Sequence, residues 1–212
     1  MKTILCYGDS NTYGYDPSNG LRYPKNQRWT TLLEEKLKET YDLIPEGLNG
    51  RTTDSDWENE DVKNGMRHLD TILRSHRPLD IVVFMLGTND CKFELHKDAK
   101  KITEGMEKLV VRTKELLNSK QGYAPEIVVV CPPHIREEVL QGPFAFEFSK
   151  DSLKTCDGLF EEYKALCDRH GCIFADASAA DISPADGLHL SVRGHEDIAE
   201  LLYRCISSLA SF

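Results

Sequence analysis

Two short runs in the sequence are apolar at every position. Residues 81–86 read Ile-Val-Val-Phe-Met-Leu, and residues 127–131 read Ile-Val-Val-Val-Cys. A strand with one face in water alternates apolar and polar residues, so uninterrupted runs indicate strands that are covered on both faces. Strands of this kind are typical of a parallel sheet that lies between two layers of helices.

The remaining chain alternates between strand and helix signals. Strands are expected at residues 3–8, 41–44, 80–86, 127–131 and 172–175. Apolar residues at helical spacing predict helices at residues 29–39, 62–76, 102–117, 153–170 and 192–209. No linker or internal repeat divides the sequence. Residues 1–212 are therefore expected to form one α/β domain, with three layers around a five-stranded parallel sheet and right-handed crossovers.

The charge balance argues against two classes of partner. The chain carries 35 acidic and 26 basic residues, a net charge of −9, whereas proteins that bind nucleic acid or anionic membranes need clustered cations. The first apolar run ends at Asp9, too early for a signal peptide. No apolar run approaches the roughly 20 residues of a membrane span. We expect a cytoplasmic protein that binds neither nucleic acid nor a membrane.

The seven cysteines favour reduced thiols. Their number is odd and no Cys-x-x-Cys motif occurs, so a disulfide framework is not expected. Cys167, His170 and Cys172 lie close in sequence but lack a fourth ligand for zinc. The sequence therefore predicts neither a metal site nor a cofactor.

Four polar clusters stand where apolar strands end or just before the last helix. They are Gly8-Asp9-Ser10, Asn49-Gly50, Gly87-Thr88-Asn89-Asp90 and Asp186-Gly187-Leu188-His189. Because ligands of open α/β sheets bind at the carboxyl ends of the strands, these clusters are expected to meet at one edge. Together they supply a nucleophile, a base with an orienting carboxylate, and donors for an oxyanion, which are the parts needed for acyl transfer.

Each cluster has a structural interpretation when it is taken alone. A serine in this position can cap a helix, Asn-Gly marks a turn, and an asparagine after a strand can form an Asx turn. The Asp186-x-x-His189 spacing is the most specific signal, because the carboxylate can hold Nδ1–H and leave Nε2 free for the proton of Ser10. His195 falls inside the last helix and is expected to be structural.

The four clusters resemble the sequence blocks of the GDSL-type SGNH hydrolase superfamily. The similarity spans residues 8–195, and the stretches 4–10, 46–53 and 85–90 are most similar to the bacterial arylesterase/acyltransferase branch. The resemblance implies a flavodoxin-like fold, a small-molecule ester substrate and a homo-oligomer. It also implies residue roles: nucleophile Ser10, base His189 and its partner Asp186, with an oxyanion hole formed by Ser10, Gly50 and Asn89.

Several positions depart from that branch or surround the expected site. Asn11 stands where the name-giving motif has Leu, and Tyr13 and Tyr15 stand where acyltransferase relatives can carry Trp. The residues expected to contact substrate are Asp9, Asn11, Tyr13, Asn49 and Phe144.

Two long connections interrupt the alternation of strands and helices. Residues 51–60 are expected to be a largely solvated acidic loop, whose Trp57 would suit a neutral sugar. Residues 132–150 carry Phe144, Phe146 and Phe148. This second connection is either a wall of the site or a surface excursion that buries its own aromatic rings.

The sequence leaves three functions open. The first is a serine esterase that hydrolyses short, acetyl-type esters through an acyl-enzyme intermediate, with acyl transfer as a second activity. A carbohydrate-ester deacetylase would use the same triad and differ only in its pocket. From another class, the loop at residues 8–14 also fits a flavin- or nucleotide-binding module of flavodoxin type.

Overall fold

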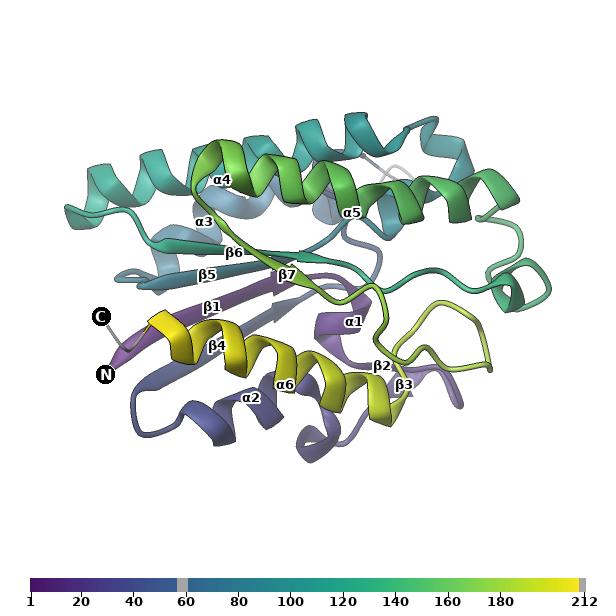
Figure 1. Cartoon of the computed structure of the whole chain (residues 1–212), viewed down its shortest axis with the longest axis horizontal. Helices are drawn as coiled ribbons and strands as arrows, with labels where there is room; N and C mark the ends of the chain where they lie inside the picture. Colours follow the sequence, from purple (N-terminus) through teal and green to yellow (C-terminus); the bar gives the residue numbers. More distant parts are fainter. Residues whose placement is uncertain (57–60, 210–212) are drawn as a thin grey trace.

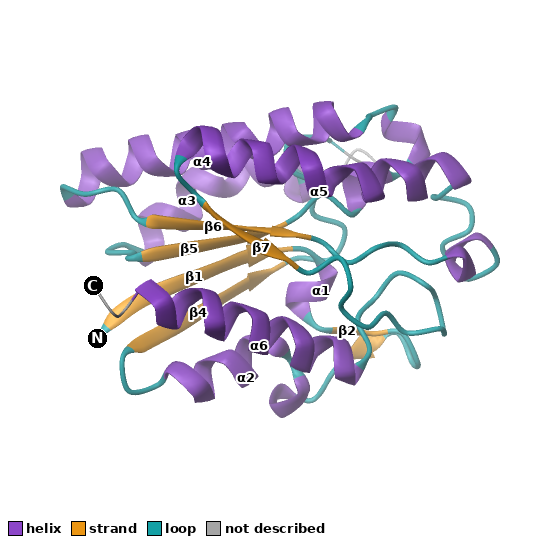
Figure 2. Ribbon diagram, in the orientation of Figure 1, coloured by secondary structure: helices purple, strands orange, loops and turns teal. Residues whose placement is uncertain are grey.

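A five-stranded parallel sheet forms the centre of the protein (Figures 1 and 2). The computed structural model describes residues 1–56 and 61–209. The strand order is β4-β1-β5-β6-β7, and all four neighbouring pairs are parallel. The strands are β1 (Lys2–Gly8), β4 (Tyr41–Gly47), β5 (Ile81–Met85), β6 (Glu126–Cys131) and β7 (Ile173–Asp176). The predicted fold class is confirmed.

Helices cover both faces of the sheet, as the apolar strands require. On one face lie α3 (Gly65–His76), α4 (Ala99–Gln121) and α5 (Lys150–His170); on the other lie α2 (Trp29–Leu37) and α6 (Val192–Leu209), as Figure 1 shows. Successive side chains of β1 enter opposite cores. Leu5 and Tyr7 pack on the first face, whereas Ile4 and Cys6 pack on the second. A strand that is buried on both faces therefore shows no alternation of apolar and polar residues.

Some helices are longer than their apolar periodicity predicts. Helix α4 begins at Ala99, because the Asp98 carboxylate accepts a hydrogen bond from the Lys101 N–H at 2.8 Å. It ends where Gly122 adopts a left-handed conformation, with φ of 87°. Ser149 likewise caps α5. Polar first and last turns carry no apolar signal, so their extent depends on capping.

A two-stranded hairpin was missed by the sequence analysis. It pairs β2 (Tyr15–Asp16) with β3 (Leu21–Arg22) directly after the short helix α1 (Ser10–Tyr13). Its turn is held by the Asp16 carboxylate, which accepts hydrogen bonds from Ser18 and Asn19. Strands of two residues are too short to show a periodic pattern.

The long connection at 132–150 does not behave as one surface excursion. Phe148 is buried, Phe144 is half-buried and Phe146 is 68% exposed. Within the other connection, residues 51–53 are buried, which corrects the expectation of a solvated face for that part, while Trp57 lies outside the described residues. Across 1–56 and 61–209, no helix has the length and apolar character that crossing a bilayer requires.

Candidate active site

Ser10 lies at the turn from β1 into α1, at the carboxyl edge of the sheet. The chain order reverses beside β1, since β4 and β5 flank it, and this switch point is where open α/β sheets bind ligands. Asp9 caps α1 by accepting a hydrogen bond from the Asn11 N–H at 2.9 Å. Gly8 is required before it, because a Cβ there would lie 2.1 Å from Thr12 Oγ1 and 2.9 Å from the Met85 carbonyl oxygen.

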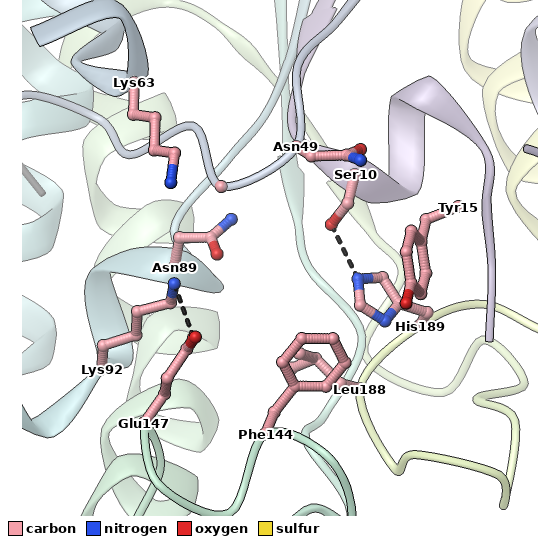
Figure 3. Close-up of a pocket in the computed structure, with 11 residues that line it drawn as sticks. Ser10, Tyr15, Asn49, Lys63, Asn89, Lys92, Phe144, Glu147, Leu188 and His189 are labelled. Atoms are coloured by element: carbon pink, nitrogen blue, oxygen red, sulfur yellow. Dashed lines mark hydrogen bonds and ion pairs between the residues drawn. The ribbon is translucent and has the colours of Figure 1, made fainter. Parts of the chain in front are cut away.

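Ser10, His189 and Asp186 form a continuous chain of hydrogen bonds. His189 Nε2 lies 2.9 Å from Ser10 Oγ (Figure 3), and His189 Nδ1 lies 2.6 Å from Asp186 Oδ2. The other carboxylate oxygen of Asp186 accepts the backbone N–H groups of Leu188 and His189, at 2.9 and 3.0 Å. This geometry holds the imidazole with one nitrogen toward the carboxylate and the other toward the hydroxyl.

The Asp186 carboxylate is electrostatically prepared for this role. Burial by itself would raise its pKa, but the hydrogen bond and charge of His189, together with the two backbone N–H groups, lower the pKa below its ordinary value. Asp186 therefore remains ionised beside the imidazole.

Three possible oxyanion donors surround Ser10 Oγ. Gly50 adopts φ of +79°, in the left-handed region. Across the parts of the chain that the structure describes, the N–H groups of Ser10 and Gly50 have no acceptor. Asn89 Nδ2 donates to the Arg51 carbonyl at 3.2 Å and lies 3.4 Å from Asp9 Oδ2. The 3.4 Å contact with Asp9 is weak, so the Asn89 amide hydrogen on that side can be donated to an oxyanion instead.

These groups open onto a pocket of about 270 Å³. One side is aromatic and apolar, whereas the other is polar and charged (Figure 3). The lining residues are Ser10, Tyr15, Asn49, Gly50, Lys63, Asn89, Lys92, Phe144, Glu147, Leu188 and His189.

Comparison with known proteins places this site in a family. The model of the GDSL-like Lipase/Acylhydrolase family matches residues 6–196. The chain belongs to this family. It is accordingly a carboxylic ester hydrolase.

Solved structures of two esterases are similar to this chain over all or nearly all of its length. A carbohydrate acetylesterase family member from Sinorhizobium meliloti is 35% identical, with a TM-score of 0.92 and coverage of 100% of both chains. The native aryl esterase of M. smegmatis is 31% identical, with a TM-score of 0.91 and coverage of 99% of this chain and 100% of that one. A comparison with curated proteins finds no match.

The family's catalytic blocks converge as the sequence positions suggested. Ser10, Gly50, Asn89 and His189 line the pocket, and Asp186 lies directly behind His189. Two of the residues expected to contact substrate, Asn49 and Phe144, line the pocket as well. The Phe144 ring centroid lies 5.3 Å from that of His189, so Phe144 packs beside the base.

Three other residues expected to contact substrate are not among those that line the pocket, and each makes a contact within the scaffold. Asp9 caps α1. The Asn11 side-chain oxygen accepts the Leu190 N–H at 2.9 Å. The Tyr13 ring is covered by the Arg22 guanidinium, with 4.2 Å between the guanidinium carbon and the ring centroid. None of these three residues lines the pocket, although all lie within three positions of the nucleophile.

Four lining residues had no assigned role in the sequence analysis. They are Lys63, Lys92, Glu147 and Leu188, from four different segments. Leu188 lies inside the Asp186–His189 cluster, whereas the other three belong to no motif. Tyr15 was noted only as a departure from acyltransferase relatives. Its ring centroid lies 4.3 Å from that of His189, and the hairpin that holds it was itself missed.

A buried arginine ties the first two catalytic segments together. The Arg51 guanidinium donates to the Gly8 carbonyl at 2.8 Å and also to the Glu46 carbonyl. It lies over the Tyr7 ring, 4.1 Å from the centroid. Burial lowers the pKa of Arg51 and raises the pKa of nearby Asp9 to about 7. The backbone turn around Gly50 is therefore anchored to the end of β1.

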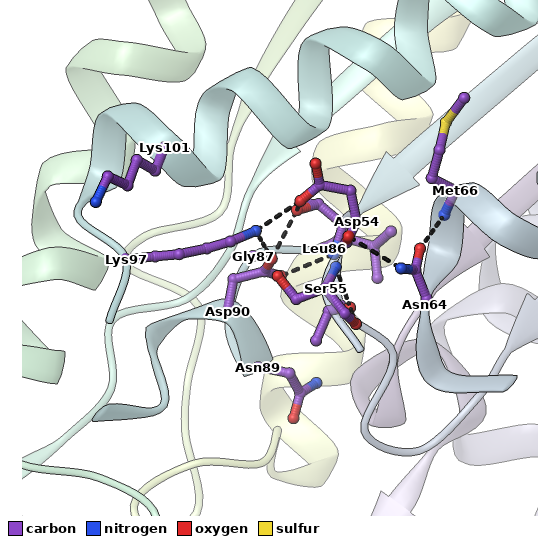
Figure 4. Close-up of polar contacts among 12 residues, drawn as sticks. Asp54, Ser55, Asn64, Met66, Leu86, Gly87, Asn89, Asp90, Lys97 and Lys101 are labelled. Atoms are coloured by element: carbon purple, nitrogen blue, oxygen red, sulfur yellow. Dashed lines mark hydrogen bonds and ion pairs between the residues drawn. The ribbon is translucent and has the colours of Figure 1, made fainter. Parts of the chain in front are cut away.

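A buried carboxylate ties the Gly50 segment to the Asn89 turn. Asp90 accepts the Thr53 N–H at 2.8 Å and the Thr53 hydroxyl at 2.6 Å. Lys97 Nζ lies 3.2 Å from Asp90 Oδ1 (Figure 4). Lys97 also contacts Asp54 at 2.6 Å. Burial raises the pKa of Asp90. The network fixes the two loops that carry Gly50 and Asn89 relative to each other.

His195 lies in the core and not in the pocket. It is fully buried, and its Nδ1 accepts the Trp29 N–H at 3.3 Å. Burial lowers its pKa to about 4, so the ring is neutral at physiological pH. It helps to join α6 to the start of α2.

Proposed function

We propose that the protein hydrolyses short-chain, acetyl-type carboxylic esters through a covalent acyl-enzyme intermediate on Ser10. The observation that carries this proposal is the hydrogen-bonded chain Ser10–His189–Asp186 facing the candidate donors of Gly50 and Asn89. Nucleophile, base, orienting carboxylate and oxyanion donors are the complete set that acyl transfer needs.

The geometry supports a two-step reaction. His189 Nε2 takes the proton of the Ser10 hydroxyl while Oγ forms a bond to the ester carbonyl carbon. The carbonyl oxygen becomes an oxyanion, stabilised by the N–H groups of Ser10 and Gly50 and the amide of Asn89. His189 then gives the proton to the alcohol oxygen, the carbon–oxygen bond breaks, and the alcohol leaves.

The second step repeats the first with water. His189 takes a proton from water, the hydroxide attacks the acyl carbon, and Ser10 leaves with the proton from the imidazolium. Asp186 stays ionised throughout and stabilises that imidazolium. An alcohol in place of water would give acyl transfer, which we propose as a second reaction of the same site.

The size of the pocket supports a short acyl group. A volume of about 270 Å³ lies just below the range typical of small-molecule sites. Phe144 and Tyr15 narrow it beside His189. One of the two similar esterases is named a carbohydrate acetylesterase, which also favours a short acyl group.

Replacing the proposed nucleophile tests the function. Ser10→Ala should lower the hydrolysis of p-nitrophenyl acetate by about three orders of magnitude or more, while the protein stays folded. An organophosphorus reagent should label Ser10 in the wild type. Ser75→Ala on α3, where the hydroxyl donates to the Thr71 carbonyl within the helix, is the control and should keep full activity. Residual activity of Ser10→Ala within tenfold of wild type would reject the mechanism.

Deacetylation of a carbohydrate ester is the second candidate for the same triad. The polar side of the pocket, with Asn49, Lys92 and Glu147, favours it over a purely apolar alcohol. A sugar ring presents hydroxyl groups to such a wall and its C–H groups to aromatic rings.

A further inference from the structure

A buried ion pair lies in the wall of the pocket. Lys92 Nζ is 2.6 Å from Glu147 Oε2, and the two side chains are only 6% and 11% exposed. Both residues line the same cavity as Ser10 and His189 (Figure 3). Lys92 follows the Asn89 turn by three residues, and Glu147 follows Phe144 by three.

Stability does not explain a pair in this position. Removing two charges from water has a cost that their attraction often fails to repay, and apolar residues of similar volume are frequently as stable or more so. The fold already joins these two segments through the backbone, since the Phe93 N–H donates to the Glu147 carbonyl at 3.1 Å. The charged side chains are therefore better explained by what enters the pocket.

The alcohol part of the ester would reach this wall if it extends from His189 along Phe144. His189 must protonate the alcohol oxygen, so the alcohol lies beside the imidazole during the reaction. The Phe144 ring packs on that imidazole, 5.3 Å between centroids. Glu147 is the next polar group along the same segment, and its N–H donates to the Phe144 carbonyl at 2.9 Å. An alcohol larger than methanol would extend along Phe144 toward the ion pair.

We propose that the Lys92–Glu147 pair determines specificity for the alcohol, by recognising hydroxyl groups on the ring or chain that carries the acetyl group. The inference rests on the proposed ester hydrolysis. A lysine ammonium has three donors and a carboxylate has several acceptor sites, so both can bind hydroxyl groups while paired. An alkyl alcohol would displace water from the two ions without replacing its hydrogen bonds.

Two esters with the same ring size test the proposal. One is a mono-O-acetyl methyl xyloside, and the other is cyclohexyl acetate, which lacks the hydroxyl groups. The measured quantity is the ratio of kcat/KM for the sugar ester to that for the cyclohexyl ester. In the double variant Lys92→Met/Glu147→Leu, which removes both charges together, this ratio should fall about tenfold to a hundredfold, because hydrogen bonds to charged groups are lost.

A surface ion pair provides the matched control. Lys36 on α2 and Glu200 on α6 are 3.0 Å apart, with side chains about two-fifths exposed. The variant Lys36→Met/Glu200→Leu should leave the ratio unchanged. If the pocket double variant does not fold, as judged by circular dichroism, Glu147→Gln keeps the side-chain size, and its ratio should still fall at least threefold.

The outcomes separate this inference from the proposed function. A folded pocket variant whose ratio stays within threefold of wild type overturns the role of the pair, even if both esters are hydrolysed more slowly. An equal change in the surface control overturns it too. Failure of the wild type to hydrolyse either ester and p-nitrophenyl acetate would instead reject the ester hydrolysis on which the inference rests.

Discussion

The side-chain oxygen of Asn11 accepts a hydrogen bond from the backbone N–H of Leu190 at 2.9 Å. Asn11 follows Ser10, and Leu190 follows His189. The contact therefore joins the two segments that carry the hydroxyl and the imidazole, although they lie at opposite ends of the chain. The Asn11 carbonyl also accepts the Trp29 indole N–H at 3.0 Å, which anchors α1 to the core.

Removing the Asn11 amide should impair catalysis more than substrate binding. In Asn11→Ala the Leu190 N–H loses its partner, and a buried unpaired donor costs about 1–3 kcal/mol of stability. We expect kcat to fall about tenfold or more with little change in KM, because the Ser10–His189 distance is no longer fixed. Steady-state kinetics and thermal unfolding measure both effects. Asn11→Asp retains an acceptor oxygen and should keep more activity; equal kcat in wild type and Asn11→Ala would contradict this role.

Neutralising Asp186 should reduce turnover without preventing folding. Asp186→Asn keeps the shape of the side chain but removes the charge that stabilises the imidazolium and favours the productive tautomer. We expect kcat to fall by about three to four orders of magnitude, with a much smaller effect on KM. The rates with p-nitrophenyl acetate check this expectation. A variant as active as the wild type would exclude Asp186 from the catalytic chain.

His195 should make the folded state less stable in acid. Its pKa is about 4 in the fold and 6.5 as the ordinary value, so between these values the unfolded chain binds more protons. The contribution of neutral His195 to the free energy of unfolding is complete above pH 6.5. It is lost as the pH falls toward 4, by about 1.4 kcal/mol per unit of pH. From pH 7 to pH 5 the loss is about 2 kcal/mol.

Urea unfolding at the two pH values isolates this contribution. His195→Asn retains an acceptor for the Trp29 N–H but does not titrate, so its free energy of unfolding should fall about 2 kcal/mol less than that of the wild type. His96→Asn, on an exposed histidine whose left-handed backbone asparagine tolerates, is the control and should follow the wild type. Parallel pH dependence in wild type and His195→Asn would show that His195 does not supply the difference.

We propose that copies of the chain associate through the 132–150 connection. Phe146 is 68% exposed and Phe93 is 43% exposed, and the segments that carry them are joined by the hydrogen bond from the Phe93 N–H to the Glu147 carbonyl. Exposed aromatic groups of this kind are typical of interfaces. Light scattering should show an oligomer at micromolar concentration, and Phe146→Asp should shift it toward the monomer. A wild-type monomer under these conditions would refute the association.

The amino-acid sequence by itself determined the architecture and the order of the catalytic blocks. Runs such as 81–86 and 127–131 have no polar positions, so they form strands only where helices cover both faces. Parallel strands then bring their carboxyl ends to one edge. Ser10, Asn89 and the Asp186–His189 pair are therefore readable from their places at the ends of elements, before any contact is known.

The tertiary structure alone decided which side chains form the pocket wall. Asp9, Asn11 and Tyr13 follow β1 yet make scaffold contacts, with the α1 N-terminus, the Leu190 N–H and the Arg22 guanidinium respectively. Lys92 and Glu147 pair across distant segments, and in the sequence each is an ordinary polar loop residue. Local patterns report backbone periodicity and caps, whereas a partner across the fold depends on how whole layers pack. The wall of this pocket is therefore built from contacts that have no local signal in the sequence.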